Sequence, residues 1–130
     1  MSQLDAYLTA LAAGDAAGLV ASLREDTALR VAVHDEPFIG RDTIRFIFGH
    51  LFAGVLNDVQ IRDVLADGNR RVAVFDVRVE GHEGTAEGLN LITIDSEGQL
   101  ADVTVFLRPL AALQALADEM GRRLGGPRPA

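Results

Sequence analysis

The 130-residue chain contains no cysteine, no tryptophan and no lysine, and all twelve of its basic residues are arginine. Without cysteine the chain can form neither disulfides nor thiolate sites. Its formal net charge is −7, and the arginines form no basic block. This charge balance disfavours nucleic acid or an anionic membrane as a partner.

Long hydrophobic runs are also missing, and no apolar stretch approaches the length of a membrane span. The N-terminal segment MSQLDAYLTALAAGD has apolar residues at helical spacing but no basic region. It therefore does not resemble a signal peptide. We expect a soluble, cytoplasmic protein that does not contact a membrane.

Motifs for metals and cofactors are not found either. The three histidines, His34, His50 and His82, have no paired spacing, so no metal site is expected. The chain has no P-loop, dinucleotide fingerprint or nucleophile-elbow motif. The sequence predicts no cofactor.

What is present is a helical first half and a strand-rich second half. Apolar residues at helical spacing predict one helix from Ser2 to Gly14, a second from Asp15 that carries Leu23, and a third after Gly40. Alternating patterns separated by turn residues predict strands over residues 29–33, 58–65, 70–80, 85–95 and 99–108. Pro109 is expected to open a last helix.

This order predicts an α+β class in a single domain over residues 1–124, followed by a flexible tail at residues 125–130. The predicted strands are apolar on both faces. We therefore expect helices to cover one face of the sheet and a second copy of the chain to cover the other, as a homodimer. The alternative is a sheet covered by the C-terminal helix.

Three stretches carry a family resemblance: YLTALAAGDAAGLVASLREDTAL, EPFIGRDTIRFIF and LITIDSEGQLADVTVF. In this order they resemble the nuclear transport factor 2-like superfamily, which includes ketosteroid isomerases and SnoaL-type polyketide cyclases. The chain also resembles uncharacterised bacterial SnoaL-like proteins that end in V-x-V-x-x-R-P-L, here VTVFLRPL. The resemblance implies a cone-shaped, cystatin-like fold, with a curved antiparallel sheet around the N-terminal helices and a C-terminal helix.

The resemblance also implies where an isomerase site would lie. The family's oxyanion-hole tyrosine falls on Tyr7, its second oxyanion donor on Asn90 and its catalytic base on Val31. A valine cannot abstract a proton, so we do not expect an ordinary ketosteroid isomerase. Tyr7 and Asn90 remain as two donors for a carbonyl or enolate oxygen. Alternatively, Tyr7 packs in the core and Asn90 fixes the register of a strand or of the dimer.

Around this pair the same alignment places an apolar lining that suits a flat hydrophobic ligand. Its expected members are Val31, Val33, Phe48, Ala73, Phe75, Val77, Ile92, Val103, Val105 and Leu107.

His34 and Asp35 lie in a polar corner before Pro37. Histidine titrates near neutral pH, so His34, or the neighbouring Asp35, is a candidate for the missing base. The alternative is a solvated corner with no role in catalysis.

Asp76 and Arg78 offer a different chemistry. In the register above they face away from the cavity, as an exposed or interfacial ion pair. A β-bulge would turn them inward, where they would resemble the Asp/Arg pair of limonene-type epoxide hydrolases, with Asp102 or Glu87 as the second acid.

Two main hypotheses follow for function. The first is an isomerase, cyclase or dehydratase acting on a small hydrophobic molecule through Tyr7, Asn90 and His34 or Asp35. The second is a non-catalytic module that binds such a molecule or serves as a dimeric scaffold. An ionisable group inside the cavity would favour the enzyme.

Overall fold

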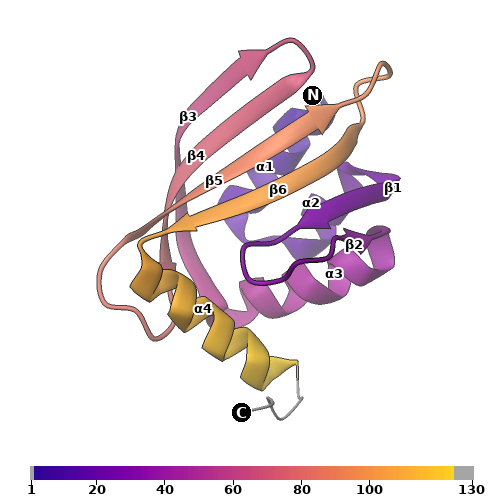
Figure 1. The fold of residues 1–130 in the computed structure, drawn as a ribbon. Coiled ribbons are helices and arrows are strands. Elements are labelled where there is room, and N and C mark those ends of the chain that lie inside the picture. The colour runs from indigo at the N-terminus through magenta and orange to yellow at the C-terminus, as the bar shows by residue number, and fades with distance from the viewer. Residues whose placement is uncertain (1, 125–130) are drawn as a thin grey trace.

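The structure is a computed structural model that describes residues 2–124. The expected tail at residues 125–130 lies outside the described part. The elements, in chain order, are α1 (Gln3–Ala13), α2 (Ala16–Ala21), β1 (Leu23–Arg30), β2 (Phe38–Ile39), α3 (Arg41–His50), the π-helical turn η1 (Leu51–Val55), β3 (Leu56–Asp67), β4 (Arg70–Val79), β5 (Ala86–Ile94), β6 (Leu100–Arg108) and α4 (Leu110–Arg123) (Figure 1). This arrangement confirms the α+β class.

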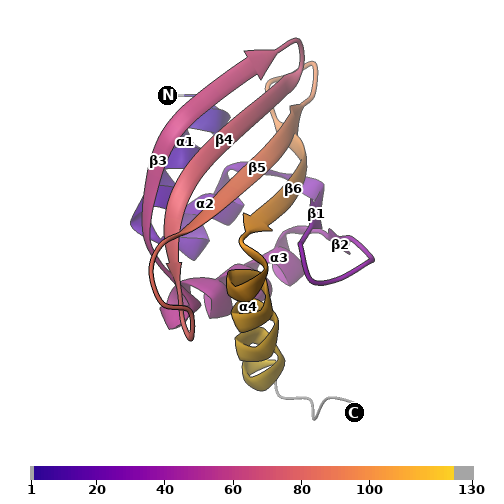
Figure 2. The same cartoon turned by 60° about the vertical axis from the view of Figure 1, so that its left-hand side comes forward.

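One six-stranded sheet organises the molecule, with strand order β2-β1-β6-β5-β4-β3. Figure 2 shows that α1 and α2 lie on one side of this curved sheet and that α4 extends from the end of β6. Neighbouring strands run antiparallel except for β1 and β6, which are parallel. No helix among residues 2–124 is both long enough and apolar enough to cross a membrane.

The helix boundaries in the first half follow local capping. Ser2 and Asp5 form a reciprocal capping box at the start of α1, and Gly14 ends that helix in the left-handed region at φ 68°. The Asp15 side chain caps α2. The predicted second helix was too long, because α2 ends at Ala21 and Leu23 already begins β1.

The first strand is longer than the sequence predicted. It begins at Leu23 rather than Leu29, and its charged residues Glu25 and Asp26 are exposed while Leu23, Thr27 and Leu29 are buried. The buried Thr27 hydroxyl donates to the Leu100 carbonyl of β6 at 3.0 Å. Pairing with β6 therefore stabilises as a strand a segment whose charged residues are not typical of strands.

The register of the second half decides which side chains face the helices. β4 and β5 pair without a break from Arg70↔Thr93 to Val77↔Ala86, and Asn90 lies opposite Ala73. The irregularities lie instead in the β3–β4 pair, at the Thr93/Ile94 end of the β5–β6 pair and in the β1–β6 pair. As a result alternate residues of the central strands are buried, among them Ala73, Phe75, Val77, Asn90, Ile92 and Val103.

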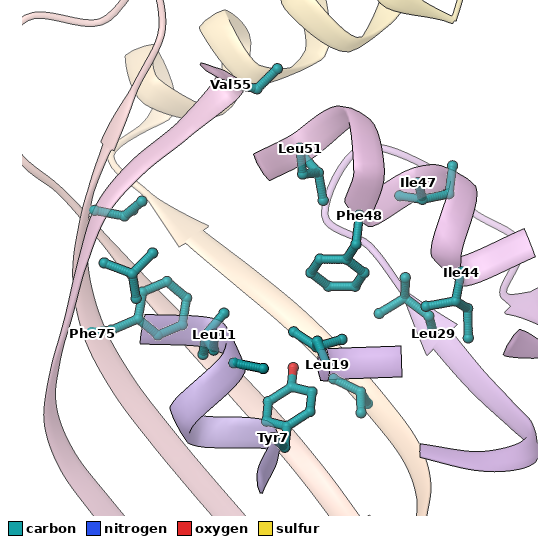
Figure 3. Packing of buried hydrophobic residues seen from close by; sticks show 14 of the residues in the cluster. Tyr7, Leu11, Leu19, Leu29, Ile44, Ile47, Phe48, Leu51, Val55 and Phe75 are labelled. Carbon is teal, nitrogen blue, oxygen red and sulfur yellow. The ribbon is translucent and has the colours of Figure 1, made fainter. Parts of the chain in front are cut away.

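The buried side chains form one cluster between the inner face of the sheet and the helices. Figure 3 shows the Tyr7 hydroxyl pointing from α1 into the middle of this core, with Leu11 and Leu19 nearby and Phe48 across from it. The core therefore joins the helical layer to the sheet.

Candidate functional site

A cavity of about 410 Å³ lies between the inner face of the sheet, α3 and α4. Its walls come from five parts of the chain. The lining residues are Leu11 of α1; Val31, Ala32, Val33, His34 and Phe38 of the β1–β2 region; Ile47, Phe48 and Leu51 of α3 and η1; Leu56, Phe75, Asn90 and Val105 of the sheet; and Leu116, Ala117, Met120, Gly121 and Leu124 from α4 and the residue after it. None of these lining residues carries a carboxylate.

Asn90 is the buried polar side chain of this lining, and it is 2 % exposed. Its Nδ2 donates to the Tyr7 hydroxyl oxygen at 2.7 Å. Its Oδ1 is also buried and has no hydrogen-bond partner among the described residues. A buried amide oxygen without a partner is unfavourable, so this atom is where a ligand would gain most from a polar contact.

Tyr7 lies behind Asn90 rather than in the cavity wall. Its side chain is fully buried, and it does not line the cavity. Burial raises the pKa of the Tyr7 phenol, an effect that the hydrogen bond from Asn90 opposes and does not cancel. The structure thus brings the two expected donors together, but it presents Asn90 alone to the space.

The expected apolar lining divides into two groups. Val31, Val33, Phe48, Phe75 and Val105 line the cavity. The others lie beside it in the packed inner layer of the sheet: Ala73, Val77, Ile92, Val103 and Leu107. The side chains of this second group pack in or against the core beside the cavity and do not border it.

His34 lies at the exposed rim of the cavity. Its ring stacks on Phe38 with ring centroids 4.9 Å apart, and its Nδ1 lies 2.9 Å from the Glu36 carbonyl oxygen and 3.2 Å from the Glu36 backbone nitrogen. Nδ1 is therefore engaged with the loop, which leaves Nε2 to meet a ligand. Asp35 is exposed and is not part of the lining.

Asp76 and Arg78 lie on the outer face of the sheet, away from the cavity. Asp76 forms an ion pair with Arg62 at 3.2 Å, and Glu87 pairs with both Arg62 and Arg108. The inward turn required by the epoxide-hydrolase alternative does not occur, because β4 pairs with β5 in unbroken register from Arg70 to Val77. Asp102 also points outward and pairs with Arg30.

The contribution of α4 to the cavity was not predicted from the sequence. Four residues of this helix, and Leu124 directly after it, form one wall of the cavity. Arg123 holds this end of the helix in place, since its Nη1 donates to the Ala53 carbonyl of η1 at 2.7 Å. The helical spacing of Leu116, Met120 and Leu124 was visible in the sequence, but not the surface against which it packs.

Within residues 2–124 there is no group of three or more histidine, aspartate or glutamate residues placed to hold an ion.

Comparisons with known proteins agree on the family. The SnoaL-like domain model matches residues 4–103. A steroid delta-isomerase from Pseudomonas aeruginosa is 32 % identical, with 94 % of this chain and 88 % of that chain covered and a TM-score of 0.82. A bacterial protein with a cystatin-like fold from Silicibacter pomeroyi DSS-3 is 27 % identical, with 94 % and 84 % covered and a TM-score of 0.84.

A SnoaL-like polyketide cyclase from Jannaschia sp. CCS1, at 16 % identity, 88 % and 91 % coverage and a TM-score of 0.69, shares the fold. Among curated proteins there is no match. These likenesses confirm the cystatin-like, cone-shaped fold that the resemblance implied. The chain belongs to the family of SnoaL-like domains.

Proposed function

We propose that this protein binds a small, neutral and largely apolar molecule in the cavity beneath α4. The observation that carries this proposal is the lining itself. It encloses about 410 Å³ and is built almost wholly from aliphatic and aromatic side chains, with Asn90 as its buried polar member. Such a space gains free energy when an apolar ligand displaces water from it.

The size and charge of the site narrow the ligand class. A cavity of 410 Å³ lies within the range of sites that enclose small molecules, and it suits a polycyclic body such as a steroid or polyketide fragment. The lining contains no arginine, so a buried carboxylate or phosphate would lack a counter-charge. A neutral ligand is therefore favoured over a fatty acid.

The test is a thermal-shift titration with steroids, aromatic polyketide fragments and fatty acids. Binding at a ligand concentration of about 100 Kd adds about 2.7 kcal/mol to the free energy of unfolding, which corresponds to several degrees in Tm for a domain of this size. The neutral polycyclic compounds should raise Tm and the fatty acids should not.

A pair of matched variants locates the effect. Val105→Trp fills the cavity and should abolish the shift, because Val105 lines it. Val64→Trp makes the same change at a residue of β3 that is 44 % exposed and does not line the cavity, so it should bind as the unaltered protein does. Absence of any ligand-induced shift, or an equal shift in Val105→Trp, would contradict the proposal.

A second candidate function is isomerisation of a bound ketosteroid. The relative that is 32 % identical is a steroid delta-isomerase, and the Nδ1 of His34 lies 2.9 Å from the Glu36 carbonyl oxygen. In the tautomer whose Nδ1–H donates to that oxygen, Nε2 carries no proton and is available at the rim as a base. If this chemistry occurs, His34→Ala should lower kcat by at least about a hundredfold, the usual contribution of a positioned base. Turnover that survives this change would remove His34 from the mechanism, and no turnover in the unaltered protein would leave ligand binding as the function.

A further inference from the structure

The amide of Asn90 has an unequal set of partners. Nδ2 donates a hydrogen bond to the Tyr7 hydroxyl oxygen at 2.7 Å, whereas Oδ1 has no partner in the described part of the chain. Asn90 also lines the cavity. The polar atom that remains for a ligand is therefore an acceptor with two lone pairs, not a donor.

We propose that the natural ligand carries a hydroxyl group, or another neutral hydrogen-bond donor, on an apolar body and donates it to Asn90 Oδ1. This inference rests on the proposed function, because it assigns the ligand class of the same cavity. This arrangement is the opposite of an oxyanion hole, in which donors of the protein surround a carbonyl or enolate oxygen of the ligand. Here the protein supplies the acceptor and the ligand supplies the donor.

Three features of the site support an alcohol or phenol as the ligand. The Oδ1 atom is buried, so its missing hydrogen bond cannot be supplied by bulk solvent. The other lining residues that surround it are apolar apart from His34 at the rim, so they offer no competing donor at depth. A ligand hydroxyl that displaces a water from this atom reproduces the hydrogen bond of that water, and a ketone does not.

Tyr7 fixes which way the amide points. Its phenol is fully buried, and its hydroxyl oxygen accepts from Nδ2 at 2.7 Å, the orientation in which Oδ1 remains without a partner. The reverse orientation of the amide would turn an N–H donor towards the cavity and would favour a ketone. The two orientations thus predict opposite ligand preferences.

The experiment compares three probes with one ring system: β-tetralol, β-tetralone and tetralin. Their Kd values for the full chain are measured by calorimetry at one pH and temperature. We expect tetralol to bind about tenfold or more tightly than tetralone, the difference that one buried hydrogen bond makes. Tetralin should bind with an affinity at or below that of the ketone.

Replacement of Asn90 by leucine should bring the three Kd values together by weakening tetralol alone. Because this change also removes the partner of Tyr7, its folding is checked by circular dichroism, and the comparison of probes on the unaltered protein stands without it. Equal binding of tetralol and tetralone, or tighter binding of tetralone, overturns this inference while leaving the cavity as a ligand site. Failure of all three probes, and of larger neutral polycycles, to bind overturns the proposed function and this inference together.

Discussion

Tyr7 is the single tyrosine of the chain, which has no tryptophan, so its ionisation can be followed without interference. The phenol is buried and its pKa is raised. The folded state therefore holds this proton more tightly than the unfolded state does. The stability this provides is complete below the ordinary tyrosine pKa of about 10 and is lost as the pH rises above it.

We expect the ultraviolet absorbance of phenolate to stay absent at pH about 10, where a free tyrosine is half ionised. It should appear at higher pH together with loss of the circular dichroism signal of the fold. A reversible titration at pH about 10 in a protein that remains folded would show that Tyr7 is accessible to water.

Gly88 determines where the Phe75 ring lies. The two residues are directly opposite in the β4–β5 pair, and a Cβ at position 88 would lie 2.4 Å from two carbons of that ring. Gly88→Ala should therefore push Phe75 into the cavity, lower the free energy of unfolding by about 1–3 kcal/mol and weaken ligand binding. Urea unfolding and calorimetry measure the two effects.

Gly49 provides the matched control. It lies inside α3 and a Cβ there meets nothing within 4 Å. Gly49→Ala should therefore raise the free energy of unfolding by about 0.5–1 kcal/mol. If Gly88→Ala behaves in the same way and binds ligand normally, Phe75 does not depend on the glycine opposite it.

At this scale the sequence predicted which side chains turn inward but not where space is left. The alignment to the family, applied to the alternation along β4 and β5, correctly assigned Phe75, Val77, Asn90 and Ile92 to the buried face. Phe75 and Asn90 border the cavity, whereas Val77 and Ile92 do not. Whether an inward residue borders the cavity depends on how far the helices extend over the sheet. The pattern of a single strand carries no information about that extent.

Among the elements, α4 and η1 depend on each other. The α3 helix gives way to η1, where Ala53 and Gly54 leave helical backbone geometry, so the Ala53 carbonyl is free to accept from Arg123. Glu119 holds the same guanidinium through a contact of 3.0 Å between its Oε2 and the Arg123 Nε. This junction keeps the C-terminal part of α4 over the cavity.

Arg123→Ala should loosen that end of the helix, lowering the free energy of unfolding by about 1 kcal/mol and speeding hydrogen exchange in α4. Bound ligand should also dissociate faster. Arg122→Ala is the control, because Arg122 pairs with the same Glu119 but its side chain is 68 % exposed, and its loss should change little. Equal effects of the two changes would show that the Ala53 contact is not important.

Acid should weaken the same junction. Hydrogen bonds from Arg122 and Arg123 lower the pKa of the Glu119 carboxyl. A carboxyl with a lowered pKa stabilises the fold at neutral pH, and this stabilisation is lost as the pH falls below its ordinary value towards the lowered one. The Tm difference between the unaltered protein and Glu119→Gln should therefore shrink as the pH falls below about 4.5. A constant difference from neutral to acid pH would exclude this carboxylate as the cause.

The elements also show why some boundaries escaped the sequence. The strand-rich second half was predicted closely, because turn residues separate its alternating patterns; β4 to β6 start and end within one or two residues of expectation. The bounds of β1 were not predicted, since its partner β6 lies about 75 residues away in the chain. Pairing with β6 stabilises the strand at REDTA, a segment that has no strand pattern of its own.

At the scale of the whole molecule, the outer face of the sheet carries apolar side chains that the helices do not cover. Val72, Val74, Leu89 and Leu91 lie there half-buried, and Phe106, opposite Leu89, is 51 % exposed. Next to them the ion pairs of Arg62, Asp76, Glu87 and Arg108 cross the sheet. An apolar centre beside charges of both signs is suited to contact a second copy of itself about a two-fold axis.

We propose that two copies associate through this face, and Phe106→Glu tests the proposal. A charge in the centre of an apolar interface is left without a counter-charge on association, so this variant should be monomeric where the unaltered protein has twice the chain mass of 13.9 kDa. Sedimentation at micromolar concentration distinguishes the two states. Phe46→Glu is the control, since Phe46 is 57 % exposed on α3, away from the sheet face. The Phe46→Glu variant should remain dimeric. A monomeric unaltered protein would contradict the proposal. Dissociation by both changes alike would also contradict it, because a charge outside the sheet face would then have the same effect as a charge in its apolar centre.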